Sequence, residues 1–553
     1  MRREPQKSRS APRPSRNFAM SAPDRLTQAI SDAYDETPYL SLPFSYTAPG
    51  SLRAVAHLYG ISAPELNRAR VLELGCAAGG NLLPFAIAYP DARVVGVDLS
   101  PQQIEAGQRA AEAAGARNLD LHAMSLTDIT PEFGTFDYII CHGVFSWVPP
   151  EVRDAILRIC KENLAPEGIA YISYNTYPGW KASDVLRDAM MLNSFGAQTP
   201  QEKVARAKDM LNLIENGLWE NNPLQSALQH TAQKLRGQSD HYLLHEYLEA
   251  VNTPCYFLEF AAAAQQAGLA YLTDAEPQLT FPSTYGSRVA LGLNGLAVNA
   301  GREMREQYLD FAVGRSFRKS LLVHAERAGA MLEQPEGGAF TKMFFAADLR
   351  PQPTPAGAPP QQRDYMTARG ATLSSRDPVA HSLMDLLGES WPQSVTFDAI
   401  REAATANAPD KSGQELTDAL LAHVIALVQS NALSYRLEPS SYGRSQPKPQ
   451  LIAGALDLLP VVIKPDSQIS MHNLWHQGVT PPSDPLSLHI IGMMDGSRTT
   501  AELRSAVRDA LTAGRHPHPN GQTYKGARNL EPVAQEFLNS LMVKLRRNGL
   551  LLN

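Results

Sequence analysis

The chain has 553 residues, of which 44% are hydrophobic and 19% charged, and a formal net charge of −6. That length exceeds what one hydrophobic core supports, so we expect roughly three or four domains. No apolar run approaches the roughly 18 residues of a membrane-spanning helix, and the four cysteines lack the CxxC spacing of a zinc module or a disulfide framework. The composition therefore predicts a soluble, cytoplasmic protein.

Positive charge gathers at the start of the chain. Residues 1–20 include six Lys/Arg and a single Glu, but no apolar stretch of the kind that a secretory signal needs. We predict residues 1–22 to be a disordered basic tail, with Met20 as an alternative start. A nucleic-acid or membrane-tethering arm is the alternative. Because the remainder of the chain is acidic, we expect no nucleic-acid partner.

Short apolar runs alternate with helical stretches between residues 23 and 195. Residues 52–59 have the apolar spacing of a short helix. The runs VLEL, RVVGVDL, FDYIICH and IAYISYN, which begin at residues 71, 93, 136 and 169, are typical of buried strands. Strands that alternate with helices indicate a mostly parallel sheet covered on both faces. The sequence therefore predicts an α/β domain over residues 23–195.

Beyond residue 180 the pattern changes to long Ala/Leu-rich helical stretches. We expect a mostly helical domain over residues 196–348. A linker is expected over residues 349–372, because LRPQPTPAGAPPQQR contains five prolines and has no apolar period. A domain boundary is expected there.

The C-terminal region contains a weak internal repeat. DPVAHSLMDLLGESW from Asp377 resembles DPLSLHIIGMMDGSR from Asp484, and each copy ends in a helix with a short apolar tail. We predict two small winged-helix-like modules within residues 373–553. Neither copy has a Lys/Arg-rich recognition helix, so packing against protein is favoured over DNA binding.

The segment VLELGCAAGGN, residues 71–81, indicates a ligand site. Glu73 lies near the end of a buried strand, and Gly75 and Gly79 let the following turn bend sharply and approach a ligand. A helix expected to begin near Asn81 offers free N–H groups to an anionic group, such as the carboxylate of S-adenosylmethionine (SAM). Asp98, at the end of the next strand, can accept both ribose hydroxyls.

A glycine-rich turn with a distal acid also describes a dinucleotide site. Two features favour SAM: Glu73 precedes the turn, and Ala77 stands where the GxGxxG pattern has its second glycine. No GKS or GKT follows, which excludes a phosphate-binding P-loop. A structural turn without a ligand is the remaining alternative.

The strings around this turn resemble a known family. VLELGCAAGGNLLPFA, VVGVDLSPQQI, FDYIICHGVFSWVP and ISYNTYPGW resemble bacterial SAM-dependent methyltransferases that carry a methyltransferase regulatory domain. HEYLEAVNTPCYFLEFAAAAQQAGLAYL and EQYLDFAVGRSFRKSLLVHAE resemble its regulatory region. The family includes lysine methyltransferases that act on bacterial surface proteins. The resemblance covers residues 30–553 and implies a class I, Rossmann-like core, a helical regulatory or substrate domain and paired C-terminal modules.

The resemblance implies roles for residues at matching positions. Tyr34 and the segment PYLSLPF would close over the cofactor as a lid. Many SAM enzymes place an acid beside the adenine where this chain has Met124 and Ser125, so Ser125 with the Leu126 backbone is expected to substitute, with Asp128 as a second contact. The expected cofactor-binding residues are Tyr34, Glu73, Gly75, Cys76, Ala77, Gly79, Asn81, Asp98, Leu99, Ser125, Leu126 and His142.

The methyl acceptor is expected at the carboxyl ends of the parallel strands, where open α/β sheets bind ligands. His142 and Trp147 follow the fourth strand, and Tyr174 and Asn175 end the fifth, so we expect these four residues at the catalytic site. Polar and aromatic side chains together suit a cationic amine such as lysine. For Trp147 the alternative is an anchor that packs the helical region onto the sheet.

Two histidines four residues apart raise the question of a metal. His241 and His245 lie on an expected helix beside Glu246 and Glu249. The pattern is not HExxH and has no evident third ligand, so we expect a polar helix face and no metal.

These features predict a SAM-dependent methyltransferase that modifies a protein side chain, with a lysine amine as acceptor and the extra domains holding the substrate. A small-molecule methyltransferase whose extra domains dimerise or cover the site is one alternative. A SAM-sensing regulator without enzymatic activity is another. A homodimer is one candidate assembly.

Overall fold

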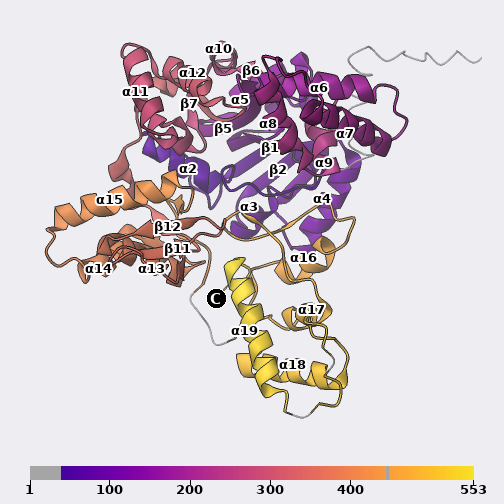
Figure 1. Cartoon of the computed structure of the whole chain (residues 1–553), viewed down its shortest axis with the longest axis vertical. Coiled ribbons are helices and arrows are strands. Elements are labelled where there is room, and N and C mark those ends of the chain that lie inside the picture. The colour runs from indigo at the N-terminus through magenta and orange to yellow at the C-terminus, as the bar shows by residue number, and fades with distance from the viewer. Residues whose placement is uncertain (1–38, 444–447, 523, 528, 553) are drawn as a thin grey trace, which may run out of the picture.

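The computed structural model describes residues 39–443, 448–522, 524–527 and 529–552. The basic tail, Met20 and Tyr34 lie outside the described residues. Within that part of the chain, no helix is both long and apolar enough to span a bilayer. Figure 1 shows a central sheet with helices around it and two groups of C-terminal helices below, α13 to α15 and α16 to α19.

The central sheet confirms the predicted α/β architecture. Its strands in spatial order are β3 (Leu119–Ala123), β2 (Arg93–Asp98), β1 (Arg70–Leu74), β4 (Phe136–Cys141), β5 (Leu164–Tyr177), β8 (Phe317–His324) and β7 (Leu269–Asp274), and β6 (Cys255–Tyr256) also pairs with β5. Strands β1 to β5 run parallel, whereas β8 is antiparallel to both of its neighbours. The strand order reverses between β1 and β4, which is where ligands bind in open α/β sheets.

Helices cover both faces of this sheet. One face packs against α2 (Pro49–Leu58), α3 (Leu83–Ala88) and α4 (Pro101–Ala113), and the other against α5 (Pro150–Glu162) and α10 (Phe257–Gln266). Helix α4 begins where the Ser100 side chain accepts a hydrogen bond from the Gln103 N–H, with proline at the first helical position. The helix expected over residues 52–59 corresponds to α2.

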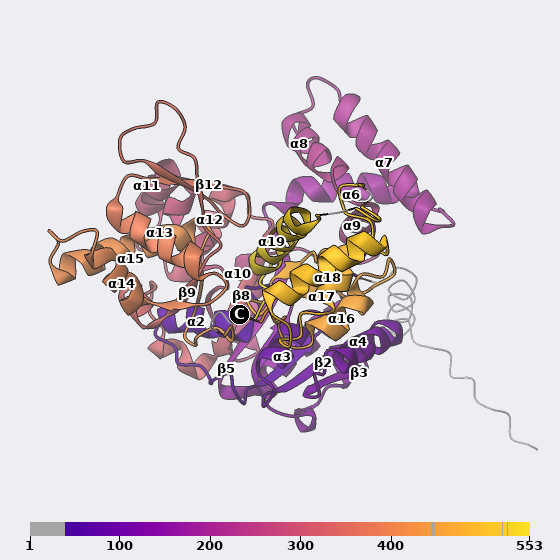
Figure 2. The ribbon, with the colours of Figure 1, turned by 90° about the horizontal axis from the view of Figure 1, so that it is seen from below.

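A separate helical lobe follows β5. It consists of α6 (Trp180–Ser194), α7 (Pro200–Asn216), α8 (Gln225–Arg236) and α9 (Asp240–Tyr247). These helices share a hydrophobic cluster of their own, distinct from the two beside the sheet. Figure 2 shows α7 and α8 projecting away from the sheet.

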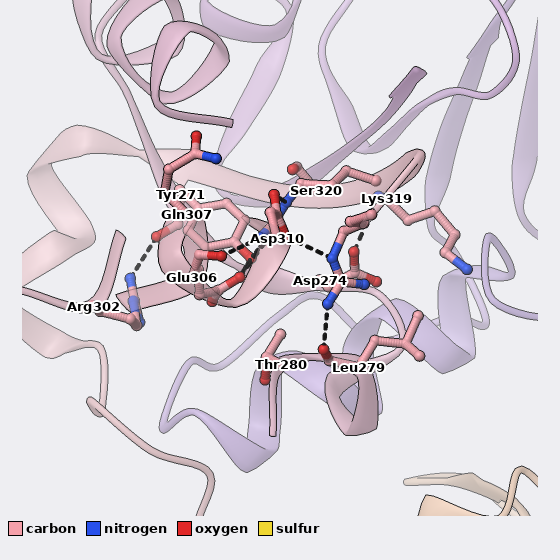
Figure 3. Close-up of polar contacts among 12 residues, drawn as sticks. Tyr271, Asp274, Leu279, Thr280, Arg302, Glu306, Gln307, Asp310, Lys319 and Ser320 are labelled. Carbon is pink, nitrogen blue, oxygen red and sulfur yellow. Dashed lines mark hydrogen bonds and ion pairs between the residues drawn. The ribbon is translucent and has the colours of Figure 1, made fainter. Parts of the chain in front are cut away.

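Strands β7 and β8 lie inside the region that the sequence predicts to be helical. Between them come α11 (Ser287–Leu296) and α12 (Arg302–Val313). The Arg318 guanidinium of β8 is 1% exposed and donates to Glu306 and Asp310 of α12 at 2.7 and 2.8 Å. Figure 3 shows Glu306 and Asp310 within this group of polar side chains. Lys319, the residue after Arg318, pairs with Glu276. These buried charges interrupt the apolar run expected of an inner strand, which is why β8 is hard to recognise from the sequence.

The segment expected to be a linker is ordered into strands. A three-stranded antiparallel sheet contains β10 (Arg350–Gln352), β11 (Arg363–Met366) and β12 (Thr372–Ser375). Its prolines lie in the first strand and in the connection to the second, where a missing N–H breaks no inner ladder. Strand β9 (Phe344–Ala346), before this segment, pairs with two strands beyond it, so the chain has no simple break at residue 349.

The two halves of the internal repeat form separate helical groups. The first comprises α13 (Pro378–Ser390), β13 (Val395–Thr396), α14 (Phe397–Thr405), α15 (Gly413–Gln429) and β14 (Ser434–Arg436). The second comprises α16 (Ala455–Val462), β15 (Met471–His472), β16 (Gly478–Val479), α17 (Pro485–Ile491), α18 (Thr500–Ala513) and α19 (Glu531–Arg547). Asp377 and Asp484 are the N-caps of α13 and α17: Asp377 accepts the Val379 N–H, and Asp484 accepts the Ser487 N–H. The winged-helix assignment stays a prediction.

Candidate active site

The turn after β1 has the backbone that its glycines predict. Gly75, Ala77 and Gly79 have positive φ angles of 73°, 49° and 72°. A Cβ atom on Gly75 would lie 2.3 Å from a methyl group of Val144. A side chain at this position would therefore clash with Val144, and it would also strain a backbone with positive φ. Helix α3 begins at Leu83, two residues later than expected. The turn therefore needs its glycines.

Asp98 lies at the end of β2, beside this turn. Its Oδ2 accepts a hydrogen bond from the Ala77 N–H at 2.8 Å, and its Oδ1 accepts one from the Ser100 N–H at 3.0 Å. These two backbone donors fix the orientation of the carboxylate. Asp98 is thus held at the mouth of the glycine turn with its charge stabilised.

Glu73 and Asn81 form a buried pair on the inner side of the turn. The Asn81 Nδ2 donates to Glu73 Oε1 at 2.7 Å. Glu73 Oε2 is buried and has no hydrogen-bond partner among the described residues. Burial, followed by the nearby Asp98 charge, raises the pKa of Glu73 to about 8 against the favourable hydrogen bond from Asn81. A buried acid with an unused oxygen is suited to a polar or cationic ligand.

A cavity of ≈ 260 Å³ opens over the turn. Eleven of the residues expected at the site line it: Glu73, Gly75, Cys76, Ala77, Asn81, Asp98, Leu99, Ser125, Leu126, His142 and Trp147. The segment expected to be a lid lies over it and contributes Tyr39, Leu40, Ser41, Leu42 and Phe44. Gly79 does not line the cavity. It faces Leu121, and a Cβ atom on Gly79 would lie 3.2 Å from that side chain.

His142 lies at the centre of an aromatic group between the lid and the sheet. Its Nδ1 is 3.0 Å from the Tyr171 hydroxyl and 3.0 Å from the Ser173 hydroxyl, and its ring centroid is 4.2 Å from that of Phe44. Burial, and secondarily the charge of Lys319, lowers the pKa of His142 to about 3. The imidazole is therefore neutral near pH 7, which suits a role in positioning rather than in supplying a proton.

Two of the four residues expected at the catalytic site lie elsewhere. Tyr174 is 1% exposed on the opposite face of β5, where its ring stacks on Phe260 with a centroid distance of 4.1 Å. Asn175 is buried, donates to Asn252 Oδ1 at 3.1 Å and is not among the cavity residues. Side chains alternate between the faces of a strand, and Tyr174 falls on the face away from the cavity. We therefore assign neither residue to the site.

Trp147 contacts both the cavity and the helical lobe. It lines the cavity, and its ring meets that of Trp180 of α6 edge-on at 6.3 Å. Trp180 in turn stacks on Tyr247 of α9. One aromatic chain therefore joins the cavity wall to the helical lobe.

Helix α9 contributes a cavity residue that sequence reasoning did not select. Glu246 lines the cavity and makes no hydrogen bond or ion pair with any described residue. Burial, followed by the charge of Glu249, raises the pKa of Glu246 to about 7. The sequence gives only a weak sign of this position: Glu246 lies within one helical turn of Leu243 and Tyr247, which are both buried.

The two histidines of α9 pack against the lid. His241 and His245 lie 5.7 and 4.0 Å from the Tyr39 ring, centroid to centroid. His245 Nδ1 is 3.2 Å from Glu249 Oε1. Among the described residues, no group of three His, Cys, Asp or Glu side chains could hold a metal ion. This helix face therefore contacts the lid.

The sheet order, the glycine turn and the acids beside it define a nucleoside-binding α/β enzyme of methyltransferase type. Residues 71–168 match the model of a methyltransferase domain, and residues 239–324 match that of the predicted methyltransferase regulatory domain. Uncharacterized protein RP789 of Rickettsia prowazekii (strain Madrid E) is 35% identical over 413 residues, which cover 74% of each chain. The chain belongs to the family of methyltransferases that carry this regulatory domain.

Further comparisons agree with this assignment. Uncharacterized protein RP028 of the same organism is 43% identical over 244 residues, which cover 44% of this chain and 96% of that protein. The structure of PKMT2 from Rickettsia typhi matches with a TM-score of 0.81 and 27% identity, covering 93% of this chain and 100% of that one. The same protein in complex with AdoHcy matches with a TM-score of 0.80 and 28% identity.

The cofactor of such a methyltransferase is SAM, and the residues of the cavity fit it. The unpartnered Glu73 oxygen, the oriented Asp98 carboxylate and a turn that cannot accept a Cβ are the groups that a cationic nucleoside ligand requires. When bound, SAM supplies a methyl group on a sulfonium, open to attack by a nucleophile.

Proposed function

We propose that this SAM-dependent methyltransferase modifies a protein side chain and that the acceptor is a lysine amine. The observation that carries the proposal is the unpaired Glu246 carboxylate, which lies in the same cavity as Asp98 and Glu73. We assign ribose binding to Asp98, and contacts beside the adenine to Ser125 and Leu126. Tyr39, Phe44 and Trp147 form the aromatic walls of the acceptor end.

An amine acceptor creates a chemical requirement that these residues meet. A lysine ammonium has a reference pKa of about 10.4, so its deprotonation near pH 7 costs about 4.6 kcal/mol. Burial between aromatic rings lowers that cost, because a low-dielectric site disfavours the charged form. Glu246, with its pKa raised to about 7, is suited to receive the proton at neutral pH. The lysine nitrogen is then left neutral and nucleophilic.

The rest of the chain supports a macromolecular substrate. The family that the chain resembles includes lysine methyltransferases of bacterial surface proteins. The helical lobe and the two C-terminal groups lie around the central sheet (Figure 2). One observation favours a small-molecule acceptor as the second candidate: the lid residues Tyr39 to Phe44 cover a cavity of modest size. After reaction with labelled SAM, label on a protein would support a protein acceptor, and label on a small molecule would support the second candidate.

The role of Glu246 is tested by Glu246→Gln, with Glu249→Gln, three residues further on and just beyond the end of α9, as the matched control. The titratable groups near Glu246 are Tyr242, His245 and Tyr247 of α9 and Glu249 just beyond it. The other ionisable groups of the cavity are Tyr39 of the lid, Glu73, Cys76, Asp98 and His142. Because the carboxylate accepts the proton only when ionised, kcat/KM of the natural enzyme should rise with pH through about 7. Glu246→Gln should lower kcat about 100-fold and abolish this rise.

The control makes a further prediction. Because Glu249 raises the pKa of Glu246, Glu249→Gln should keep most of the activity and shift the rise to lower pH. Calorimetry of SAM binding checks the alternative that Glu246 binds the cofactor ammonium. A large loss of SAM affinity in Glu246→Gln, or an unchanged pH profile, would contradict the assignment.

A further inference from the structure

The side-chain oxygen of Asn81 joins three parts of the chain that are distant in sequence. It accepts the Phe44 N–H of the lid at 2.9 Å, and the Thr47 hydroxyl lies 3.0 Å from it. His476 Nε2, from the second C-terminal group, is also 3.0 Å away. Asn81 is buried, and its Nδ2 donates to Glu73. One amide therefore links the cofactor acid, the lid and a residue 395 positions further along the chain.

The direction of the His476 contact follows from the partners of the amide. The Phe44 N–H can only donate, so the Asn81 atom facing it is the oxygen, and the nitrogen faces Glu73. An amide oxygen can only accept, so His476 carries a proton on Nε2. Burial lowers the pKa of His476 well below its usual value, which leaves the ring neutral with that single N–H.

His476 is held in a rigid turn. It has a left-handed backbone with φ of 61°, and its N–H donates to the Asn473 carbonyl at 3.1 Å. The neighbouring Trp475 is 1% exposed, donates its indole N–H to the Pro392 carbonyl at 2.8 Å and packs under the Arg436 guanidinium. The imidazole therefore has little freedom to leave Asn81.

The same C-terminal segment holds the lid at a second point. The Ser41 N–H donates to the Gln468 carbonyl at 2.8 Å, and the Ser470 N–H donates to the Ser41 carbonyl at 3.2 Å. On its other side, the Ser41 hydroxyl accepts the Gly80 N–H at 2.8 Å. A Cβ on Gly80 would lie 2.5 Å from the Ser41 carbonyl oxygen. The lid is thus enclosed between the glycine turn and residues 468–470.

We propose that the second C-terminal group is part of the cofactor site: His476 is a positioning residue that orients Asn81, and through it Glu73 and the lid. Cofactor binding and docking of residues 468–479 are then coupled, because each stabilises the same arrangement of Asn81. The proposal rests on the SAM site of the proposed function and does not depend on the identity of the acceptor.

Variants of the full chain test this coupling by calorimetry with SAM and AdoHcy. His476→Leu removes the N–H and should weaken cofactor binding about tenfold. His476→Gln, whose side-chain NH₂ can reach the position of Nε2, should restore affinity to within about threefold of the natural chain. His472→Leu is the matched control, because His472 is equally buried in β15 and neither ring nitrogen has a partner among the described residues. It should leave affinity unchanged.

Hydrogen exchange of the natural chain gives a second reading that needs no variant. Saturating AdoHcy should slow amide exchange in residues 468–479 as well as in the glycine turn. Unchanged exchange there would overturn the proposal even if His476→Leu fails to fold. Equal loss of affinity in His476→Leu and His472→Leu, or none in His476→Leu, would also overturn it. Failure of the natural chain to bind SAM would instead contradict the cofactor assignment itself.

Discussion

At the residue scale, the site depends on acids whose surroundings differ. Asp98 is stabilised as a carboxylate by two backbone N–H groups, whereas the buried Glu73 and the half-buried Glu246 have fewer donors and raised pKa values. Glu73 and Asp98 could be identified from the sequence, because each lies at or near the end of an apolar strand. Glu246 could not, because an isolated glutamate on a helix is most often a solvated residue.

The buried Glu73 makes stability depend on pH. Its pKa is raised from 4.5 to about 8 in the folded chain, so its contribution to stability is present in full below pH 4.5 and is lost as the pH rises through 8. Between those pH values, the free energy of unfolding should fall by at most about 1.4 kcal/mol per pH unit because of this one proton. Glu73→Gln keeps an oxygen for Asn81 but removes the titration.

Thermal melts without cofactor at pH 5 to 8.5 check this prediction. The midpoint of Glu73→Gln should fall less with rising pH than that of the natural chain, so that the variant is relatively more stable at pH 8. Parallel curves would show that Glu73 does not titrate in this range. Glu132→Gln, at an exposed site in a short 3-10 helix, is the control and should run parallel to the natural chain.

At the element scale, strands with continuous apolar runs were predictable and strands with buried charges were not. The runs at residues 71, 93, 136 and 169 became β1, β2, β4 and β5. Strand β8 was missed because Arg318 and Lys319 interrupt its pattern. Sequence also could not tell which face of β5 meets the site, because both faces are buried. The sequence therefore placed Tyr174 on the wrong face. Its neighbour Ser173 is on the cavity side, where its hydroxyl contacts the cavity residue His142.

The Arg318 cluster carries an element-scale prediction. Arg318→Met leaves the buried Glu306 and Asp310 carboxylates without their main cation, a change that costs roughly 3–5 kcal/mol. The melting midpoint should fall by roughly 6–20 °C. Arg305→Met, which breaks the exposed pair with Glu333, is the control and should leave the midpoint nearly unchanged. Equal midpoints for both variants would show that the buried cluster does not stabilise β8.

At the scale of the whole molecule, the regions that the sequence predicts to be successive domains contribute to the same sheets and to the same hydrophobic core. Strands β7 and β8 complete the sheet of the catalytic region, and β9 pairs across the proline-rich segment. One hydrophobic cluster runs from Leu52 of α2 through Trp475 to Leu545 of α19. Such sharing joins elements far apart in sequence, so composition and periodicity could not reveal it.

The central claim is that the chain transfers a methyl group from SAM to a lysine of a protein. The most direct measurement is mass spectrometry of native lysate proteins after reaction with isotope-labelled SAM, with small molecules collected separately. We predict label on lysine side chains in the protein fraction, lost with Asp98→Ala because the cofactor site is impaired, and strongly reduced with Glu246→Gln. Label confined to the small-molecule fraction, or found on protein side chains other than lysine, would contradict the account.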